Sequence, residues 1–295
     1  MKEVFVDKNF RDDTYYLIEE VNSVLDKYRE MGYDLTVRQV YYQLVAQALI
    51  ENSLKSYKRL ASAVNNGRLA GLIDWDMIVD RTRKVVIPAH WDSPADIVRS
   101  AAHSFRIDKW EDQPNHVEVM VEKQALEGVL IPVCRKLDIP FTANKGYSSQ
   151  SAMYRAGKRI DQKLSDGKTP YVLYLGDHDP SGMDMDRDIL ERLSMFSEYP
   201  LEVERLALLM DQIEQMDVPE NPAKTTDSRS KGYIAMFGGS SWELDAVEPQ
   251  ELERLVTEAV EGLRDEPTWD EAVAKENKMR EELWAFVDDY EYEGE

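Results

Sequence analysis

The 295-residue chain has only one cysteine, Cys134, so it cannot form an internal disulfide. This excludes a disulfide-stabilised secreted scaffold, and a reducing compartment is the simplest expectation. The sequence also lacks an apolar run near the roughly 18 residues of a membrane span. Its first residues, MKEVFVDKNFRDD, contain no apolar stretch of the kind found in secretory signals. We therefore expect a cytoplasmic protein that does not contact a membrane.

Basic residues are scarce as well, with 36 Lys and Arg against 57 Asp and Glu and a net charge of −21. That balance argues against a protein built chiefly to coat polyanions. The charge is unevenly distributed, because residues 241–295 hold 19 acidic and 5 basic residues and alone carry −14. From Arg38 to Arg68, five basic residues oppose only Glu51. A phosphate backbone could bind there, although a solvated helical face is the alternative interpretation.

Length and patterning predict an α/β protein with two domains and an extension. In the first, at 1–110, we expect helices over 13–31, from Thr36 onward and over 54–69. The segment IDWDMIVDRTRKVVIP could form a β-ribbon after them. This order is typical of a winged-helix domain, although helical bundles share it. The stretch from Pro88 to Pro114 shows no clear periodicity and is interpreted as the domain connection.

Strand and helix patterns alternate in the second predicted domain, at 111–240. HVEVMVEK, IPFTANK, YVLYLGD and a segment near LEVERLALL are predicted strands, with helical patterns between them. This alternation predicts a mainly parallel sheet covered on both faces, with ligands outside the carboxyl ends of its strands. The remaining residues, 241–295, form a predicted helical and strongly acidic extension.

Three carboxylates follow two of the predicted strands. Glu122 ends the first strand of the second domain, while Asp177 and Asp179 lie in GDHDPSG after the strand that starts at Tyr171. Three hard oxygen ligands suit Mg²⁺ or Mn²⁺ better than zinc. Turn formation or helix capping is the alternative role for such aspartates. His178 is a possible further ligand, although a lone histidine is more often incidental.

A candidate nucleophile lies on the predicted helix that starts at Thr36. Val37, Val40, Tyr41 and Leu44 form its apolar stripe, and Arg38 and Tyr42 lie four residues apart on another face. An exposed tyrosine beside an arginine can attack phosphorus, because the guanidinium can hold the phosphate. From spacing alone, two packing tyrosines are the more common explanation.

Taken together, these motifs resemble the family that contains the A subunit of topoisomerase VI and the meiotic transesterase that makes double-strand breaks. The resemblance covers residues 33–245 and is closest to the compact stand-alone forms called topoisomerase mini-A. The four matching elements, in order, are RQVYY at 38–42, the strand end with Glu122 and Lys123, NKGY at 144–147 and DHDPSG at 177–182.

The resemblance implies a winged-helix (CAP-like) domain followed by a Toprim domain of Rossmann-like topology. Tyr42 would cleave duplex DNA through a 5′-phosphotyrosyl intermediate, and Arg38 would hold the phosphate. Glu122, Asp177 and Asp179 would bind Mg²⁺, with Mn²⁺ as a substitute. It further implies a homodimer in which each tyrosine works with the partner's metal, in a prokaryotic or mobile-element-encoded protein. The motifs of the ATPase B subunit are absent, so an ATP site would require a separate polypeptide.

The sequence departs from the family at Asn144, which replaces a glycine, and in its acidic extension. Other functions therefore stay open. One is a Toprim metal-dependent endonuclease that uses water instead of tyrosine, with a layout comparable to the nuclease subunit of the Wadjet system. Another is a DNA-binding protein that does not cleave. The extension could also fold over the basic helix as a DNA mimic, although a solvated acidic helix is the more common arrangement.

Overall fold

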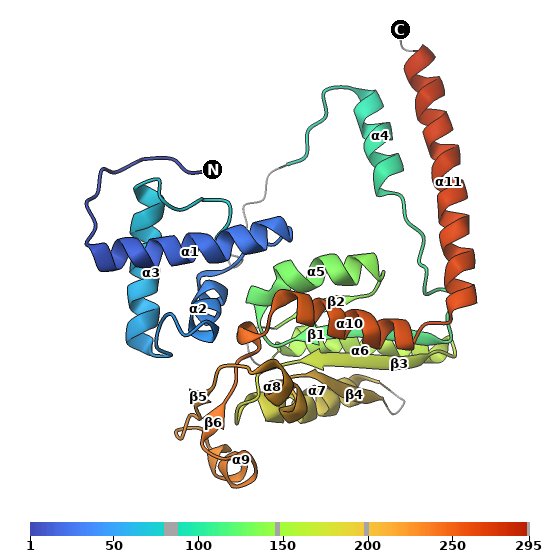
Figure 1. Cartoon of the computed structure of the whole chain (residues 1–295). Coiled ribbons are helices and arrows are strands. Elements are labelled where there is room, and N and C mark those ends of the chain that lie inside the picture. The colour runs from blue at the N-terminus through green and yellow to red at the C-terminus, as the bar shows by residue number, and fades with distance from the viewer. Residues whose placement is uncertain (80–87, 145–147, 198–200, 294–295) are drawn as a thin grey trace.

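The computed structural model describes residues 1–79, 88–144, 148–197 and 201–293 and has a mixed α/β fold (Figure 1). Within these ranges its longer helices are α1 Asp12–Glu30, α2 Val37–Ala46, α3 Leu54–Leu69, α4 Pro94–Ser104, α5 Glu127–Lys136, α6 Gln150–Ser165, α7 Gly182–Phe196, α10 Pro249–Gly262 and α11 Glu266–Glu293. The sheet strands are β1 Asn115–Val121, β2 Phe141–Ala143, β3 Thr169–Leu175 and β4 Glu202–Ala207. Smaller elements are η1 Gln124–Leu126, α8 Met210–Met216, β5 Asn221–Pro222, α9 Ser230–Phe237, β6 Ser240–Ser241 and η2 Leu244–Ala246.

The three predicted N-terminal helices are confirmed, and local signals set their ends. After α1, Gly32 takes a φ of +80°, a conformation that glycine adopts without steric cost. Thr36 and Gln39 form the predicted capping box at the start of α2. Ser53 caps α3 by accepting a hydrogen bond from the Ser56 amide. Half of the predicted ribbon, residues 80–87, lies outside the described residues, and in its described part Ile78 forms an isolated parallel bridge with Leu35.

The segment interpreted as a domain connection contains a helix that the periodicity did not reveal. In α4, Ser93 caps the first turn through the Asp96 amide, and Pro94 occupies the first turn. This helix packs along α11, and the two rise together from the body of the molecule in Figure 1. The rings of His103 and Trp284 meet edge to face across this contact, with centroids 4.8 Å apart.

The second half contains the predicted parallel sheet, with strand order β2-β1-β3-β4. One of its faces packs on α6 and α7 through Met120, Val172 and Tyr174. The alternate side chains of β1 and β3 belong to a core cluster that also includes residues of α5 and α10. Because both faces are covered, the strands expose their functional groups only at their ends.

The acidic extension is helical, as predicted, and its two long helices pack on different neighbours. Helix α10 packs on α5, whereas α11 lies along α4 on the side of the molecule away from α3 (Figure 1). At the start of α10, Glu248 accepts a hydrogen bond from the Tyr28 hydroxyl of α1. Among the described helices, none combines the length and the apolar character that crossing a membrane would require.

Candidate active site

The sheet brings the first two predicted acidic residues together. Val121 of β1 pairs with Leu175 of β3, so both strands end at the same level. The Glu122 amide then donates to the Leu175 carbonyl at 2.9 Å, and the Glu122 carboxylate accepts from the Asp177 amide at 2.8 Å. Both carboxylates are buried. The expected convergence at the carboxyl edge of the sheet is thus found for Glu122 and Asp177.

Asp179 differs from Glu122 and Asp177, because its side chain is hydrogen-bonded to residues at the start of α7. Its Oδ1 accepts from the Ser181 amide and hydroxyl and from the Gly182 amide, at 2.7–2.9 Å. Gly182 is required for this turn, since a Cβ there would lie 2.2 Å from the Asp177 carbonyl oxygen. Capping, the alternative that the sequence left open for these aspartates, is what the structure shows for Asp179.

Lys123 lies within a set of three carboxylates at this edge. Its Nζ is 2.8 Å from Asp177, 2.9 Å from Glu243 and 2.9 Å from Asp245. The Asp245 side chain is fully buried, and neither of its oxygens has a hydrogen-bond partner in the described structure, so the ion pair balances its charge. Sequence reasoning missed Glu243 and Asp245, because the ELD that follows Trp242 reads as the start of the acidic extension.

Burial and mutual repulsion raise the pKa values of the carboxyl groups at the ends of β1 and β3. Burial raises the pKa of Glu122 to about 7, and the nearby charge of Asp177 adds to the effect. Burial also raises the pKa of Asp177, against the opposing attraction of Lys123. For Lys123 the balance is reversed: burial disfavours its charge, but the three surrounding carboxylates raise its pKa well above the usual value.

The carboxylate oxygens are of the type that Mg²⁺ prefers, but their arrangement is not that of a formed metal site. Glu122 and Asp177 are neighbours, whereas Asp179 turns toward α7 and Lys123 occupies one oxygen of Asp177. Among the described residues, no three acidic, histidine or cysteine side chains are placed to hold one metal ion. The predicted triad of ligands is therefore only partly assembled.

Tyr42 is buried, so the expectation of an exposed tyrosine is wrong. Its side chain belongs to a residue only 4% exposed, and its ring packs edge to face on Tyr41 with centroids 5.1 Å apart. Asn221 of β5 donates a hydrogen bond to the hydroxyl at 3.3 Å. The spacing within α2 could not reveal this cover, because it comes from a segment 179 residues further along the chain.

Arg38 and Tyr42 nevertheless open onto the same cavity, which has a volume of about 330 Å³. The Arg38 guanidinium is half exposed and donates to Glu243 at 2.7 Å. Burial raises the pKa of Tyr42, and the charge of Glu243 raises it further. Lys123 and Arg38 overcome the effect of burial on Glu243 and lower its pKa, with a further contribution from a hydrogen bond with Tyr42.

Glu243 thereby connects the two predicted sites within a single chain. It pairs with Arg38 of α2 on one side and with Lys123 at the end of β1 on the other, and it lines the same cavity as Tyr42. Lys123 in turn contacts Asp177. The candidate nucleophile and the acidic sheet edge are thus joined through two side chains.

Two other residues of the matching motifs, His178 and Asn144, are also buried. The His178 ring packs against Phe237 and Trp242, and its Nδ1 is 2.8 Å from the Tyr233 hydroxyl. Burial lowers the pKa of His178. These contacts support a packing role. Asn144 is buried, and residues 145–147 of the NKGY match lie outside the described residues.

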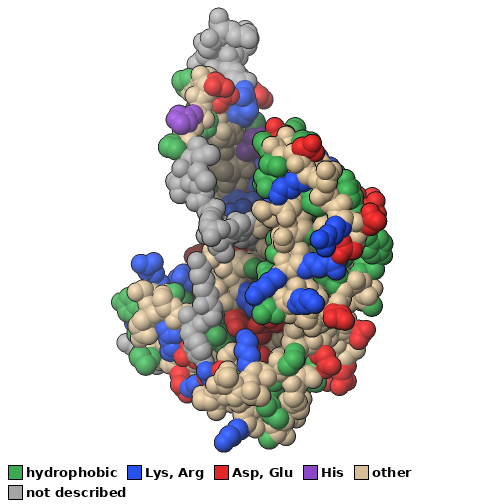
Figure 2. Space-filling model, turned by 90° about the vertical axis from the view of Figure 1, so that its left-hand side faces the viewer, with side chains coloured by type: hydrophobic (Ala, Val, Ile, Leu, Met, Phe, Trp, Pro, Cys, Tyr) green, Lys and Arg blue, Asp and Glu red, His purple; other side chains and the backbone are tan. Residues whose placement is uncertain are grey.

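The basic segment contributes few unpaired charges. Arg59 pairs with Asp13 at 3.0 Å, and Arg68 donates to the carbonyl oxygens of Trp75 and Ile78. Lys55 and Lys58 on α3 are exposed. On the face shown in Figure 2, Lys and Arg side chains are interspersed with Asp and Glu side chains. Any phosphate contact at α3 would therefore depend on a few lysines.

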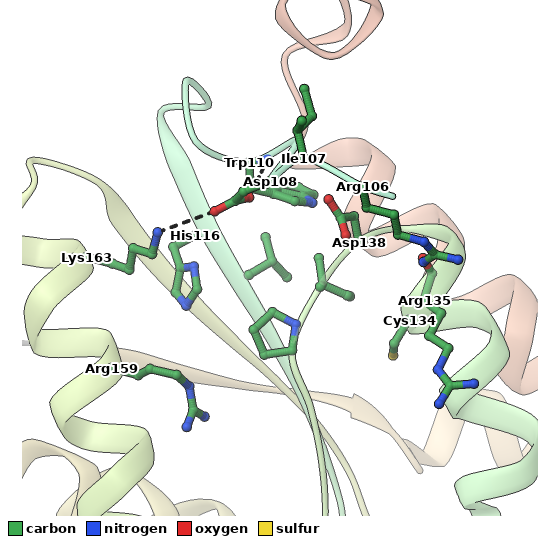
Figure 3. Close-up of a pocket in the computed structure, with 13 residues that line it drawn as sticks. Arg106, Ile107, Asp108, Trp110, His116, Cys134, Arg135, Asp138, Arg159 and Lys163 are labelled. Carbon is green, nitrogen blue, oxygen red and sulfur yellow. Dashed lines mark hydrogen bonds and ion pairs between the residues drawn. The ribbon is translucent and has the colours of Figure 1, made fainter. Parts of the chain in front are cut away.

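A second cavity, of about 500 Å³, lies at the opposite end of the strands (Figure 3). Arg159 and Lys163 of α6 line one side of it, and Arg106 and Arg135 line the other. Arg159 makes a bidentate ion pair with the buried Glu118, at 2.7 and 3.0 Å. Lys163 lies 3.7 Å from Asp108, whereas Arg106 donates to the Arg135 carbonyl oxygen at 3.2 Å.

No protein-family model matches the chain, and no curated protein is found to be related to it. The case for function consequently rests on the residues described above.

Proposed function

We propose that the chain is a DNA transesterase resembling the A subunit of type IIB topoisomerases, with a winged-helix domain that carries Tyr42 and a Toprim domain that carries the acidic edge. The observation that supports this most is the Glu243 connection, because it joins Arg38 and Tyr42 to Lys123 and Asp177 in one site. The four matching motifs are far apart in the sequence, yet residues of three of them are connected through Glu243 and Lys123.

In the proposed reaction, the phosphate of duplex DNA enters the cavity lined by Arg38 and Tyr42. The Arg38 guanidinium holds the phosphate and favours the charge that develops on it. The Tyr42 oxygen attacks phosphorus and becomes the 5′-phosphotyrosyl link, and a 3′-hydroxyl is released. Mg²⁺, if bound by Glu122, Asp177 and Asp179, would require Asp179 and Lys123 to rearrange, so no step is assigned to it.

The burial of Tyr42 favours a second candidate, a metal-dependent endonuclease of Toprim type. In that reaction a water molecule attacks the phosphate and the tyrosine only packs. The acidic edge would be needed in both cases. A DNA-binding protein that does not cleave is the third possibility, and the same experiment separates it from the others.

The test is to incubate the protein with supercoiled plasmid and Mn²⁺ or Mg²⁺, stop the reaction with SDS, and measure cleaved DNA and DNA covalently linked to protein. We expect a covalent adduct for the parent, none for Tyr42→Phe and none for Asp177→Ala. Tyr171→Phe, in the middle of β3, is the matched control and should behave as the parent. Cleavage by Tyr42→Phe at the parent rate would overturn the proposal in favour of hydrolysis. Binding without any cleavage by the parent would favour the third possibility.

The proposed partners follow from the reaction. Cutting both strands of a duplex needs two tyrosines, so we propose that the active form on DNA is a homodimer. Coupling to ATP would require a separate ATPase subunit of B type. Within one chain, Arg38 is linked to Asp177 through Glu243 and Lys123, and this link favours a site completed within each chain.

A further inference from the structure

We propose that Glu243 is the proton acceptor for Tyr42, freed for this task when a DNA phosphate takes Arg38 from it. The inference rests on the proposed transesterase function and adds a catalytic residue that lies outside the matching motifs. It answers a requirement of the reaction, because a tyrosine hydroxyl with a raised pKa cannot attack phosphorus without losing its proton.

The surroundings of the Tyr42 hydroxyl offer one hydrogen-bond donor and one carboxylate. Asn221 donates its Nδ2 hydrogen to the Tyr42 oxygen at 3.3 Å, so that oxygen is an acceptor on this side. Glu243 lines the same cavity as Tyr42, and its carboxylate can only accept a hydrogen bond. Glu243 is therefore the acidic side chain in this cavity that is available to take the tyrosine proton.

Two positively charged side chains lie close to the same carboxylate oxygen of Glu243. Arg38 lies 2.7 Å and Lys123 lies 2.9 Å from Glu243 Oε2. In this state the carboxylate is a weak base, because both positive charges stabilise its ionised form. A phosphate entering the cavity competes for the half-exposed Arg38 guanidinium, which binds phosphate bidentately. Loss of Arg38 leaves Glu243 more basic at the moment when the phosphate is in place.

The step balances as follows. The Tyr42 O–H bond breaks and its proton moves to a Glu243 carboxylate oxygen. The Tyr42 oxygen forms a bond to phosphorus, the bond from phosphorus to the 3′-oxygen breaks, and that oxygen takes a proton from water. In religation the 3′-hydroxyl gives its proton to the solvent hydroxide formed in the forward step, and its oxygen attacks phosphorus. The bond from phosphorus to the Tyr42 oxygen breaks, and the proton on Glu243 returns to that oxygen.

The experiment measures the single-turnover rate of covalent adduct formation between pH 6 and 9 for the parent, Glu243→Gln and Glu243→Asp. We expect Glu243→Gln to be slowed by at least about 100-fold at pH 7, the usual minimum contribution of a general base. Its rate should then rise with pH up to pH 9, because solvent hydroxide must remove the proton, whereas the parent rate levels off. Glu243→Asp keeps the charge beside Lys123 but shortens the reach to Tyr42, so it should be intermediate.

Glu248→Gln is the matched control, because Glu248 also accepts a hydrogen bond from a buried tyrosine, Tyr28, and also lies near a lysine, Lys27, at 3.6 Å. Its rate should stay within twofold of the parent. A DNA substrate with sulfur at the 3′-bridging position adds a second readout. The better leaving group should not restore Glu243→Gln, since the missing function is on the attacking side.

A Glu243→Gln rate within threefold of the parent would overturn the inference. An equal loss in Glu248→Gln, or a Glu243→Gln profile parallel to that of the parent, would also overturn it and indicate a structural role. If Glu243→Gln does not fold, Glu243→Asp decides by the same criteria. The proposed function fails separately, when Tyr42→Phe cleaves like the parent whatever the Glu243 variants do.

Discussion

Lys123 balances the charge of the acidic sheet edge at the level of a single residue. Its ammonium group contacts three carboxylates at 2.8–2.9 Å, and its side chain is only 19% exposed. Removing one partner of a buried ionic cluster leaves the others unpaired in a medium that solvates charge poorly. Lys123 therefore keeps Asp177, Glu243 and Asp245 close together when no other cation is bound.

We predict that Lys123→Met lowers the free energy of unfolding by about 3–5 kcal/mol, measured by urea denaturation at pH 7. Addition of 10 mM Mg²⁺ should restore more stability to the variant than to the parent, because the vacated position can accept a cation. Lys158→Met is the control, since Lys158 is half exposed and pairs with Asp161 of its own helix at 3.4 Å. A loss below about 1 kcal/mol for Lys123→Met would show that these ion pairs contribute little.

Glu118 is a second buried charge, in the middle of β1 and four residues before Glu122. Burial disfavours its ionised form, but hydrogen bonds from His116 and Arg159 outweigh burial and lower its pKa below the ordinary 4.5. A carboxyl whose pKa is lower in the folded state adds stability above pH 4.5. That contribution is lost as the pH falls through the folded-state value.

We predict that Glu118→Gln destabilises the protein by about 2–3 kcal/mol at pH 7, because Arg159 loses a charged partner. The difference from the parent should shrink as the pH is lowered below 4.5 and should stay constant from pH 6 to 8. Urea denaturation at several pH values measures this. Glu271→Gln, at an exposed position of α11, should change little at any pH. A difference that grows on acidification would contradict the assignment.

At the scale of elements, α4 and α11 form a two-helix arm whose base is held by Glu276. The Glu276 carboxylate is 2.8 Å from Lys109 Nζ and accepts from the Ile107 amide at 3.1 Å. Burial disfavours its charge, but these contacts outweigh burial and lower the pKa of Glu276. Because the residue is itself buried, the contacts are shielded from water.

We predict that Glu276→Ala loosens the base of the arm and speeds amide hydrogen exchange in α4 and in the first half of α11 by at least about tenfold, equivalent to 1.4 kcal/mol. The helices of the sheet layers should keep the parent rates. Glu271→Ala, on the same helix but exposed, is the control. Unchanged exchange in α4 would show that its contact with α11 does not depend on Glu276.

The elements that the sequence predicts well are those with local signals. The capping box at Thr36 and the alternation from Asn115 onward each fix an element without help from distant residues. In α4 the signal was also local, a serine cap followed by Pro94, but mixed polarity hid its periodicity. The pairing of β5 with β6 involves only two residues on each side, which is too short for a pattern.

The site was less predictable than the elements, because several of its contacts join residues that are distant in the sequence. Glu122 and Asp177 follow strands whose register is set by the sheet, so their proximity could be inferred. Glu243 contacts Arg38 across 205 residues of sequence, and only the packing of η2 on α2 creates that contact. The cover on Tyr42 likewise depends on tertiary structure. The domain limits of 1–110, 111–240 and 241–295 stay predictions from the sequence.

At the scale of the whole molecule, one apolar core cluster runs from the N-terminal helices into the sheet. It contains residues of α1, α2 and α3 together with residues of β1, α5 and α10. Glu243 adds a polar connection beside it, between α2 and the end of β1. Separating Tyr42 from the acidic edge of its own chain would therefore require both an apolar and an ionic contact to break.

This continuity leads to a prediction about how two copies share the chemistry. The family resemblance implies that the tyrosine of one subunit works with the acidic residues of its partner. A mixed dimer of Tyr42→Phe and Asp177→Ala would then contain one complete site and nick plasmid DNA. With sites completed within each chain, the same dimer would contain no complete site. Because Arg38, Glu243, Lys123 and Asp177 are connected within one chain, we expect no nicking.

The mixed dimer can be isolated by co-expressing the two variants with different affinity tags and purifying through both. A parent and Tyr42→Phe dimer, prepared in the same way, should nick one strand under either arrangement and so confirms that mixed dimers bind DNA. Nicking by the Tyr42→Phe and Asp177→Ala dimer at half the parent rate would show that DNA binding exchanges the contact between α2 and the sheet edge from within one chain to between two.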